Sequence, residues 1–360
     1  MKRQGYIYER ICDIDNIQEA IRRASKGKKH RKDVQKVLKN ADIYAWKIQD
    51  MLVLQKYKPN SYKKAIIKDT GTSKKTRIIY KPKFYPDQII QWAIVLQINK
   101  ILIRGEYKYS CGNVVGRGIH YGKRYLKSKI QNKFKDTKYY LQLDIHKFYP
   151  SIKIPILIKM LRNKIKDERV IKLISDILSL EDELPIGILL SQWLANFYLQ
   201  GLDHYIKEQL HVKYYLRYVD DMVLFGSNKK RLHKDRIAIA NYLKNIGLTL
   251  KSNWQVSRTD DGVDILGFRF FRDRVILRKS LMFRITRKIK RVKKRNSYNA
   301  HNCMSIISYL GWLKHCDSYT LYINWIKPYI NMPKIKSIVR RQLYANNKIS
   351  KYSKAYRVGC

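Results

Sequence analysis

Two adjacent carboxylates, Asp220 and Asp221, lie between two short runs of residues that favour strands. The run before them is Tyr214-Tyr-Leu-Arg-Tyr218 and the run after them is Met222-Val-Leu-Phe225, which predicts a β-hairpin with the acids at its tip. A hairpin tip is not expected to bury these side chains, so both should stay ionised and point the same way. Such a pair suits the binding of divalent metals against a phosphate chain better than proton donation.

A third carboxylate, Asp144, ends the alternating segment Tyr139-Tyr-Leu-Gln-Leu-Asp144. The two-residue period of a strand places Gln142 and Asp144 on the face opposite Leu141 and Leu143. Three acids suffice for two metal ions about 4 Å apart, of which one activates an attacking hydroxyl and the other stabilises a leaving pyrophosphate. Each acid also has a simpler explanation, because Asp-Asp is ordinary in turns and an acid at a strand end is often only solvated.

The charge of the chain predicts a polyanionic partner. Its 360 residues include 76 basic and 28 acidic side chains, which gives a formal net charge of +48. Such a field attracts nucleic acid, and neutralising several phosphates makes binding steeply dependent on salt. A coding sequence rich in A and T would also enrich Lys, Ile, Tyr and Asn, but it does not explain the scarcity of Asp and Glu.

Two classes of protein are disfavoured by the residue pattern. The cysteines lack the spacing of a zinc site or of a disulfide framework, and they are Cys12, Cys111, Cys303, Cys316 and Cys360. No signal peptide is evident, and no segment approaches the ~18 apolar residues of a membrane span. We therefore expect a reducing, cytoplasmic location and no membrane partner.

The elements that would position these acids alternate between helix and strand. Residues 15–56 are predicted to be helical and basic, and residues 62–80 to form short strands. Further helices are predicted over 87–98, from Ser151, from Ser191 and over 232–246, and further strands over 248–250 and 264–271. This order is typical of an α/β (α+β) fold in which a mixed sheet is layered by helices.

Residues 279–295 predict a basic amphipathic helix. They contain nine basic residues and no acid, with Phe283, Ile285, Ile289 and Val292 interleaved. Such a helix could pack its apolar stripe on the protein and lay its cations along a duplex backbone, although a merely solvated basic face is the alternative.

Five segments, in this order along the chain, resemble the motifs of reverse transcriptases between about residues 60 and 280. They are Lys75-Thr-Arg-Ile-Ile79, Leu143-Asp-Ile-His-Lys-Phe-Tyr-Pro-Ser-Ile152, Tyr218-Val-Asp-Asp221, Leu250-Lys-Ser-Asn253 and Leu266-Gly-Phe268. One such motif is weak evidence, whereas five in order are specific.

The resemblance implies a role for each matching residue. Asp144, Asp220 and Asp221, assisted by the Ile145 carbonyl, would bind two Mg²⁺ ions, for which Mn²⁺ could substitute. The expected nucleotide-binding residues are Lys75, Arg77, Tyr149, Ile186, Gln192 and Lys251. Arg77 would neutralise the triphosphate, and Tyr149 would exclude a ribose 2′-hydroxyl, which implies deoxynucleotides. On the residues alone, Arg77 is equally an exposed strand arginine and Tyr149 a buried aromatic.

The resemblance also implies a right-hand fold with fingers, palm and helical thumb. The expected parts are a basic helical N-terminal extension (1–60), fingers with part of the palm (61–135), the palm (136–278), the thumb (279–350) and a loose tail (351–360). Primer and template would contact the turn Leu266-Gly267-Phe268 and the thumb cations Arg284, Arg287, Lys288, Arg291 and Lys294.

One motif departs from the commonest pattern of the family. Leu184-Pro-Ile-Gly-Ile-Leu-Leu-Ser-Gln192 has Ile186 where many members have glutamine, and Gln192 where they have proline. This pair is similar to the reverse transcriptases of diversity-generating retroelements, which misincorporate opposite template adenines. A branched apolar residue at 186 would remove a polar side chain that helps to position correct base pairs.

The sequence thus predicts an RNA-directed DNA polymerase that copies an RNA template from a DNA or RNA primer. The diversity-generating type would be error-prone and would work with a small basic accessory protein. Two alternatives remain open, namely an antiphage, abortive-infection-like reverse transcriptase and a non-catalytic RNA-binding or splicing-helper protein.

Overall fold

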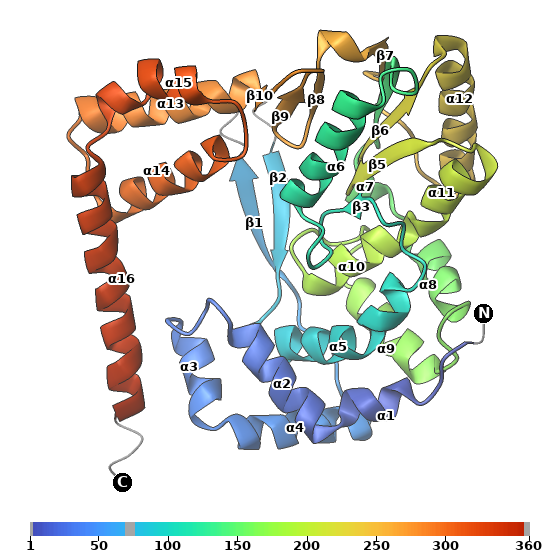
Figure 1. The fold of residues 1–360 in the computed structure, drawn as a ribbon. Coiled ribbons are helices and arrows are strands. Elements are labelled where there is room, and N and C mark those ends of the chain that lie inside the picture. The colour runs from blue at the N-terminus through green and yellow to red at the C-terminus, as the bar shows by residue number, and fades with distance from the viewer. Residues whose placement is uncertain (1–2, 69–75, 356–360) are drawn as a thin grey trace. The chain divides into compact units, whose positions relative to one another are not determined.

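The structure, a computed structural model, describes residues 3–68 and 76–355 (Figure 1). Its described residues divide into two compact units. Unit 1 comprises residues up to 125 together with 134–258, and unit 2 comprises 126–133 together with the residues from 259 onward. Residues 259–278, which the sequence placed in the palm, therefore cluster with the helices that follow them.

Unit 1 begins with four helices, of which two pack on a fifth. They are α1 (Ile7–Cys12), α2 (Ile14–Ser25), α3 (Lys32–Lys39) and α4 (Ala41–Val53), and α5 (Ile89–Ile103) packs against α1 and α2. Asp13 starts α2, because its carboxylate accepts hydrogen bonds from the backbone N–H groups of Asp15 and Asn16. Helix α5 is apolar on nearly all sides, as expected for a helix buried in a core.

A five-stranded sheet forms the centre of unit 1, in the order β3-β5-β6-β4-β7. The strands are β3 (Ser110–Cys111), β4 (Tyr139–Asp144), β5 (Tyr214–Tyr218), β6 (Asp221–Gly226) and β7 (Gln255–Arg258). All neighbouring pairs are antiparallel except β3 and β5. The strands predicted over 139–144, 214–218 and 222–225 are confirmed.

Helix α12 (Lys229–Asn245) packs on β4, β6 and β7 of this sheet, and several helical elements share one continuous apolar core with α1–α5 (Figure 1). They are α7 (Phe148–Ser151), α8 (Ile154–Arg162), α9 (Glu168–Leu178), α10 (Leu189–Tyr198), α11 (Gln200–His204), the π-helical turn η2 (Tyr205–Gln209) and α12. Helix α6 (Ile119–Asn132) is divided after Tyr125 between the two units. The mixed helix-and-strand class predicted from the sequence is confirmed.

A separate hairpin in unit 1 joins β1 (Lys63–Lys68) to β2 (Thr76–Lys81), and the π-helical turn η1 (Phe84–Gln88) leads from it into α5. The loop before α10 packs closely on β2. The backbone N–H of Tyr80 donates to the Ile186 carbonyl at 2.7 Å, and Gly187 adopts φ +107° against Ile79. A Cβ at Gly187 would lie 2.5 Å from Cγ2 of Ile79, so a side chain has no room there.

Unit 2 combines a three-stranded sheet with a set of helices. Its strands β8 (Val263–Ile265), β9 (Phe268–Phe270) and β10 (Val275–Leu277) are antiparallel neighbours. Its helices are the 3₁₀ turn η3 (Thr259–Asp261), α13 (Lys279–Lys294), α14 (Ala300–Leu313), α15 (Tyr319–Trp325), the 3₁₀ turn η4 (Lys327–Tyr329) and α16 (Met332–Ala355).

Three sequence-based expectations for the elements were wrong. Residues 248–250 form only an isolated bridge, in which Leu250 pairs with Ile145. The strand predicted over 264–271 is two strands, because Leu266 and Gly267 both take positive φ and turn the chain back. Helix α16 continues to Ala355, so the segment from Lys351 is helical over its described part rather than loose.

Among residues 3–68 and 76–355, every helix is too short or too polar to cross a lipid bilayer.

We predict that Gly187→Ala destabilises unit 1 more than Gly116→Ala does. Both glycines have positive φ, so both substitutions incur backbone strain of about 1 kcal/mol. Only Gly187 would also collide with Ile79 and the Tyr80 carbonyl, whereas the Cβ at Gly116 meets open space. Thermal denaturation should show a clearly lower midpoint for Gly187→Ala, and equal midpoints would contradict the close packing of this loop on β2.

Candidate active site

Strand register brings the three predicted carboxylates to one edge of the central sheet. Strands β4 and β6 pair antiparallel with Asp144 directly opposite Asp221. Opposed residues of such a pair have Cα atoms about 5 Å apart. Asp220 precedes Asp221 in the two-residue turn between β5 and β6, so all three acids lie at the same end of these strands.

The turn that carries the acids is strained at Val219, which has φ +59°. A β-branched residue rarely adopts this left-handed conformation, because its Cβ crowds the backbone. Both polar groups of its backbone are held. The Val219 N–H donates to the Cys111 carbonyl at 3.0 Å, and the Val219 carbonyl accepts from Nη1 of Arg217 at 2.9 Å. The Val219 side chain lies over Gly112, where a Cβ would come within 2.7 Å of it.

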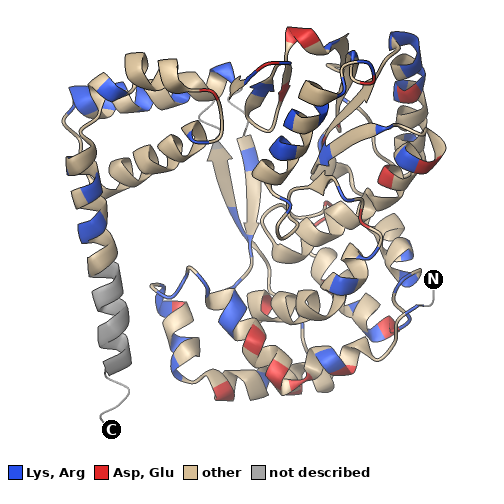
Figure 2. Ribbon diagram, in the orientation of Figure 1, with Lys and Arg blue, Asp and Glu red and all other residues tan. Residues whose placement is uncertain are grey.

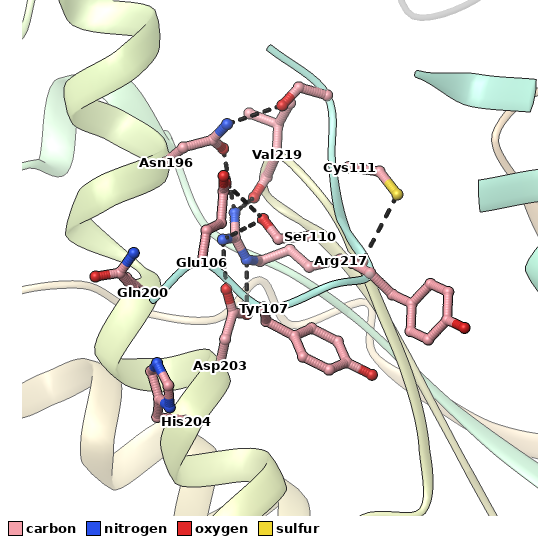
Figure 3. Close-up of polar contacts among 12 residues, drawn as sticks. Glu106, Tyr107, Ser110, Cys111, Asn196, Gln200, Asp203, His204, Arg217 and Val219 are labelled. Atoms are coloured by element: carbon pink, nitrogen blue, oxygen red, sulfur yellow. Dashed lines mark hydrogen bonds and ion pairs between the residues drawn. The ribbon is translucent and has the colours of Figure 1, made fainter. Parts of the chain in front are cut away.

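Arg217, on β5, is fully buried and is the centre of a polar network beneath this turn (Figure 3). Its guanidinium binds the equally buried Asp203 of α11 through Nε at 2.9 Å and Nη2 at 2.6 Å. It also donates to Ser110 at 2.8 Å and to Asn196 at 3.3 Å. Burial lowers the pKa of Arg217, but the Asp203 carboxylate more than offsets this and raises it above its usual range.

Two further side chains complete the network. Asn196 donates from Nδ2 to the Gly112 carbonyl at 2.8 Å, which ties α10 to the segment next to β3. Glu106 accepts from the Ser110 hydroxyl at 3.2 Å, and burial raises its pKa although Arg217 and Arg117 lower it. The network therefore connects three chain segments to the carbonyl of the strained Val219.

Asp144 is paired with Lys251. The Lys251 ammonium binds Oδ2 of Asp144, and the Lys251 backbone N–H donates to the Asp144 carbonyl at 2.8 Å. Oδ1 of Asp144 is buried and has no hydrogen-bond partner among the described residues. Lys251 was expected near a triphosphate, and the structure places it on one of the candidate metal-binding carboxylates.

The expectation that a hairpin tip leaves both acids freely solvated is wrong for Asp220. Its side chain is part-buried, and burial raises its pKa above the usual range. The Asp144 carboxylate raises the pKa further, whereas a backbone hydrogen bond, Lys251 and Arg77 lower it. Asp220 is thus electrostatically coupled to Asp144, Lys251 and Arg77.

The carboxylates fit a divalent cation chemically. A cation would give the orphaned Oδ1 of Asp144 a partner and would relieve the repulsion between Asp144 and Asp220. Hard cations such as Mg²⁺ prefer this kind of oxygen ligand. The described residues contain no group of three or more His, Cys, Asp or Glu side chains already arranged as a metal cage.

The predicted nucleotide-binding residues lie on several elements of unit 1. Arg77 is exposed on β2, and Lys75 lies outside the described residues. Ile186 is part-buried in the loop that hydrogen-bonds β2, and Gln192 is exposed on α10. The hydrogen bond between Ile186 and Tyr80 places the loop and the strand that carries Arg77 side by side.

Tyr149 is half-buried on α7, and its hydroxyl accepts from Nδ2 of Asn113 at 3.4 Å. Burial raises its pKa, Asn113 lowers it, and the Asp220 charge raises it. Asn113 follows Gly112, which lies against Val219 and Tyr218, so Asn113 connects Tyr149 to the turn that carries the acids. Asn113, which has φ +58°, was not identified from the sequence.

The predicted primer-binding turn, Leu266-Gly267-Phe268, lies in unit 2. A Cβ at Gly267 would come within 2.9 Å of the Trp312 ring, and Phe268 packs on the same ring with centroids 5.4 Å apart. The turn is thus supported by α14. The Arg278 N–H donates to the Gly267 carbonyl at 3.0 Å, which attaches the turn to the start of α13.

Helix α13 exposes most of its predicted nucleic-acid contacts. Ile285, Ile289 and Val292 are buried as expected, and the exposed cations are Arg284, Arg287, Arg291 and Lys294. Two expectations were wrong. Lys288 is half-buried and donates to Oδ1 of Asn302 at 2.6 Å, and Phe283 is 40% exposed rather than part of the apolar stripe.

Arg217 is the main site residue that sequence reasoning missed. Its signal is a single cation inside the otherwise apolar or aromatic run Tyr214–Tyr218, immediately before the two acids. A charge in a buried strand requires a partner, but the partner, Asp203, lies on helix α11 and is not indicated by the residues around Arg217.

Comparison with known proteins identifies the segment that carries these features. Residues 63–270 match the family model described as reverse transcriptase (RNA-dependent DNA polymerase). A curated relative, the retron Ec73 reverse transcriptase of Escherichia coli, is 29% identical over 131 residues. That alignment covers 32% of this chain and 42% of the relative, so the match spans less than half of the relative's length.

Solved structures with similarity include two telomerases. One is the telomerase of Candida albicans in complex with a fragment of telomeric RNA, with a TM-score of 0.47, 11% identity and coverage of 76% of this chain and 56% of that chain. The other is apo telomerase of Candida tropicalis truncated from its C-terminal domain, with a TM-score of 0.44, 12% identity and coverage of 63% and 58%.

We predict that Arg217→Met destabilises the protein by about 3–5 kcal/mol, because it leaves the buried Asp203 carboxylate without its cation. The double variant Arg217→Met/Asp203→Leu should lose less than the sum of the two single losses. Arg162→Met is the matched control, since Arg162 and Glu168 are 53% and 63% exposed and their pair should contribute only about 0–1 kcal/mol. Urea denaturation measures all four, and additivity of the two single losses would contradict the coupling.

Proposed function

The chain belongs to the reverse transcriptase (RNA-dependent DNA polymerase) family, and we propose that it synthesises DNA on an RNA template with Asp144, Asp220 and Asp221 as its catalytic carboxylates. The observation that carries this proposal is the register of β4 against β6, which places Asp144 opposite Asp221 at the turn that holds Asp220. The Asp144 carboxylate adds to the effect of burial in raising the pKa of Asp220, which supports an electrostatic interaction between these two acids.

The cofactor that this site would hold is a pair of Mg²⁺ ions, with Mn²⁺ as a substitute. Asp144, Asp220 and Asp221 would be the ligands, with the Ile145 carbonyl as an additional oxygen. When bound, two such ions lower the pKa of an attacking primer hydroxyl and stabilise the charge on a leaving pyrophosphate.

The other residues would bind and select the nucleotide. Arg77 would neutralise the triphosphate, since a guanidinium binds phosphate oxygens in a bidentate manner. Lys251 would exchange Asp144 for a phosphate oxygen when substrate binds, which reconciles its observed ion pair with its predicted role. Tyr149, held by Asn113, would crowd a ribose 2′-hydroxyl and so favour deoxynucleotides.

Binding of RNA template and primer is supported by the charge of the chain. Figure 2 shows Lys and Arg distributed over both units, and the net charge of +48 would supply affinity through phosphate contacts. In unit 2, the exposed cations of α13 and the turn at Gly267 are the proposed contacts for primer and template. We propose a cytoplasmic location, where template and nucleotides are available.

For the biological role, we propose error-prone DNA synthesis of the diversity-generating type, together with a small basic accessory protein. The support is Ile186, whose loop is hydrogen-bonded to β2, the strand that carries Arg77. An apolar side chain there cannot hydrogen-bond a base or sugar, so correct and incorrect pairs would differ less in binding energy. The retron relative supports a second candidate, a retron-like or antiphage reverse transcriptase.

We predict that Asp220→Ala/Asp221→Ala abolishes DNA synthesis by several orders of magnitude, because the site loses two of its three anionic ligands. The assay is extension of a primed RNA with Mg²⁺ and deoxynucleotides. Asp260→Ala/Asp261→Ala, in η3, is a matched control that removes the same adjacent pair of charges, and it should keep activity. Full activity of the first variant would exclude Asp220 and Asp221 as catalytic carboxylates, whereas absence of synthesis by the wild-type protein would favour the non-catalytic RNA-binding role.

We predict that the wild-type protein makes errors concentrated at template adenines and that Ile186→Gln lowers their frequency severalfold. The measurement is sequencing of the DNA made on a defined RNA. Ile156→Gln, on α8, is the control for a polar substitution at another part-buried isoleucine and should leave the error spectrum unchanged. Accurate wild-type synthesis would favour the retron-like candidate, and errors unchanged by Ile186→Gln would exclude the proposed role of this side chain.

A further inference from the structure

A pocket of about 760 Å³ opens in unit 1 between the N-terminal helices and the hairpin β1–β2. Its walls come from the α2–α3 connection, α3, α4, η1 and the start of α5, with Gly187 and Gln192 at one side. This volume lies within the range of small-molecule sites. None of the proposed catalytic carboxylates lines it.

The pocket is strongly cationic. Its walls contain six cationic side chains, Lys28, Arg31, Lys36, Lys63, Lys81 and Lys83, against one acid, Asp33, which is already paired with Arg31 at 2.6 Å. Within the described residues, Lys36, Lys63 and Lys81 form no ion pair. In Figure 2, Lys and Arg also mark the α2–α3 connection.

Two of these lysines occupy opposed positions of the hairpin. Lys63 and Lys81 are directly opposite in the register of β1 and β2, and both side chains are exposed. Like charges at opposed positions of an antiparallel pair are destabilising. Lys64, the next residue, is instead paired with Glu181 at 2.8 Å. An anion bound in the pocket would relieve the repulsion between Lys63 and Lys81.

The pocket also offers aromatic surface and an unsatisfied acceptor. Tyr44 and Tyr85 contact each other edge to face with centroids 4.8 Å apart, and the half-buried Trp92 lies on the same lining. Gln91 is only 1% exposed, and its Oε1 has no hydrogen-bond partner in the described chain. A buried acceptor without a donor is unfavourable, so a ligand that brings an N–H group would be stabilised there.

We propose that this pocket binds a nucleotide, with the base against the aromatic side chains and a base N–H donating to Oε1 of Gln91, and with the phosphate on Lys63 and Lys81. An aromatic face, a buried acceptor and several cations match the three parts of a nucleotide, and stacking of an unpaired base on aromatic rings is a usual mode of single-strand binding. The same chemistry is presented by an unpaired nucleotide of an RNA strand and by a free nucleoside triphosphate.

None of the catalytic carboxylates lines the site, although the predicted nucleotide-binding residue Gln192 does, and part of the lining lies outside the segment that matches the family. Residues 28–44 of its lining precede the segment 63–270 that matches the reverse transcriptase family. The possibility that the bound nucleotide belongs to an RNA strand rests on the proposed function, since a polymerase that copies RNA must bind unpaired template. Nucleotide binding itself is measured independently of DNA synthesis.

The test uses the full chain with Asp220→Ala/Asp221→Ala, without divalent metal, so that binding is measured in the absence of synthesis. The probes are fluorescein-labelled RNA octamers of single composition, followed by anisotropy over a range of salt concentrations. Lys63→Gln/Lys81→Gln should weaken binding about tenfold or more. The same variant should flatten the slope of log affinity against log salt by roughly 1.4, which is about 0.7 for each of two phosphates that the lysines no longer neutralise.

Gln91→Met separates a ligand contact from a structural role. The substitution keeps the length of the side chain and removes the orphaned acceptor, so the thermal midpoint should stay equal or rise while octamer affinity falls at least threefold. Lys159→Gln, an exposed lysine on α8 outside the pocket, is the charge control and should bind as the parent does. A lowered midpoint with unchanged affinity for Gln91→Met would overturn the assignment.

Competition identifies the source of the nucleotide. Displacement of the octamers by ATP, CTP, GTP or UTP at micromolar concentration supports the pocket as a free-nucleotide site. Binding of octamers without such displacement, together with crosslinks from 4-thiouridine RNA to Tyr44, Tyr85 or Trp92, supports an RNA strand. Absence of binding to either probe, or lysine variants that bind like Lys159→Gln, would overturn the proposal, whether or not the active parent synthesises DNA.

Discussion

The buried ion pair between Arg217 and Asp203 is the interaction on which the candidate active site depends. Removing both charges from water is unfavourable, and the pair is tolerated because every side of the guanidinium is hydrogen-bonded. One of those bonds goes to the carbonyl of Val219, the strained residue that precedes the two acids. The pair therefore links the stability of the core to the conformation of the turn, and a change in the network should be transmitted to the position of Asp220 and Asp221.

Electrostatics gives the site a second constraint. The chain has 76 cations and 28 acids, yet three carboxylates lie together at one edge of a sheet. There the charge of Asp144 makes ionisation of Asp220 less favourable and raises its pKa. Lys251 and Arg77 offset part of this repulsion, and Lys251 does so by direct contact with Asp144. The proposed divalent metal would replace Lys251 as the partner of Asp144, and the proposed triphosphate would replace Asp144 as the partner of Lys251.

Much of the local structure could be predicted because it depends on short-range pattern. Alternation predicted β4, short runs of strand-favouring residues predicted β5 and β6, and the apolar stripe Ile285, Ile289 and Val292 predicted the buried face of α13. Predictions that depended on solvent exposure were less successful. Asp220 is part-buried although it lies in a turn, Lys288 bonds Asn302 instead of facing solvent, and Phe283 is exposed. Exposure is decided by neighbours that are distant in sequence, and a single sequence does not reveal them.

The sequence by itself determined the chemical inventory of this protein, namely paired carboxylates between strands, a third acid at a strand end, an excess of cations, and the order of motifs that identifies the family. These features are encoded in residue type and spacing, which do not require the fold. Only the tertiary structure decided which groups meet. It set Asp144 opposite Asp221, gave Arg217 its partner on α11, placed Lys251 on Asp144, and assembled a cationic pocket from residues 28–44 and 81–92. The reason is that burial and register are properties of packed elements, and they arise only when the hydrophobic core brings distant segments together.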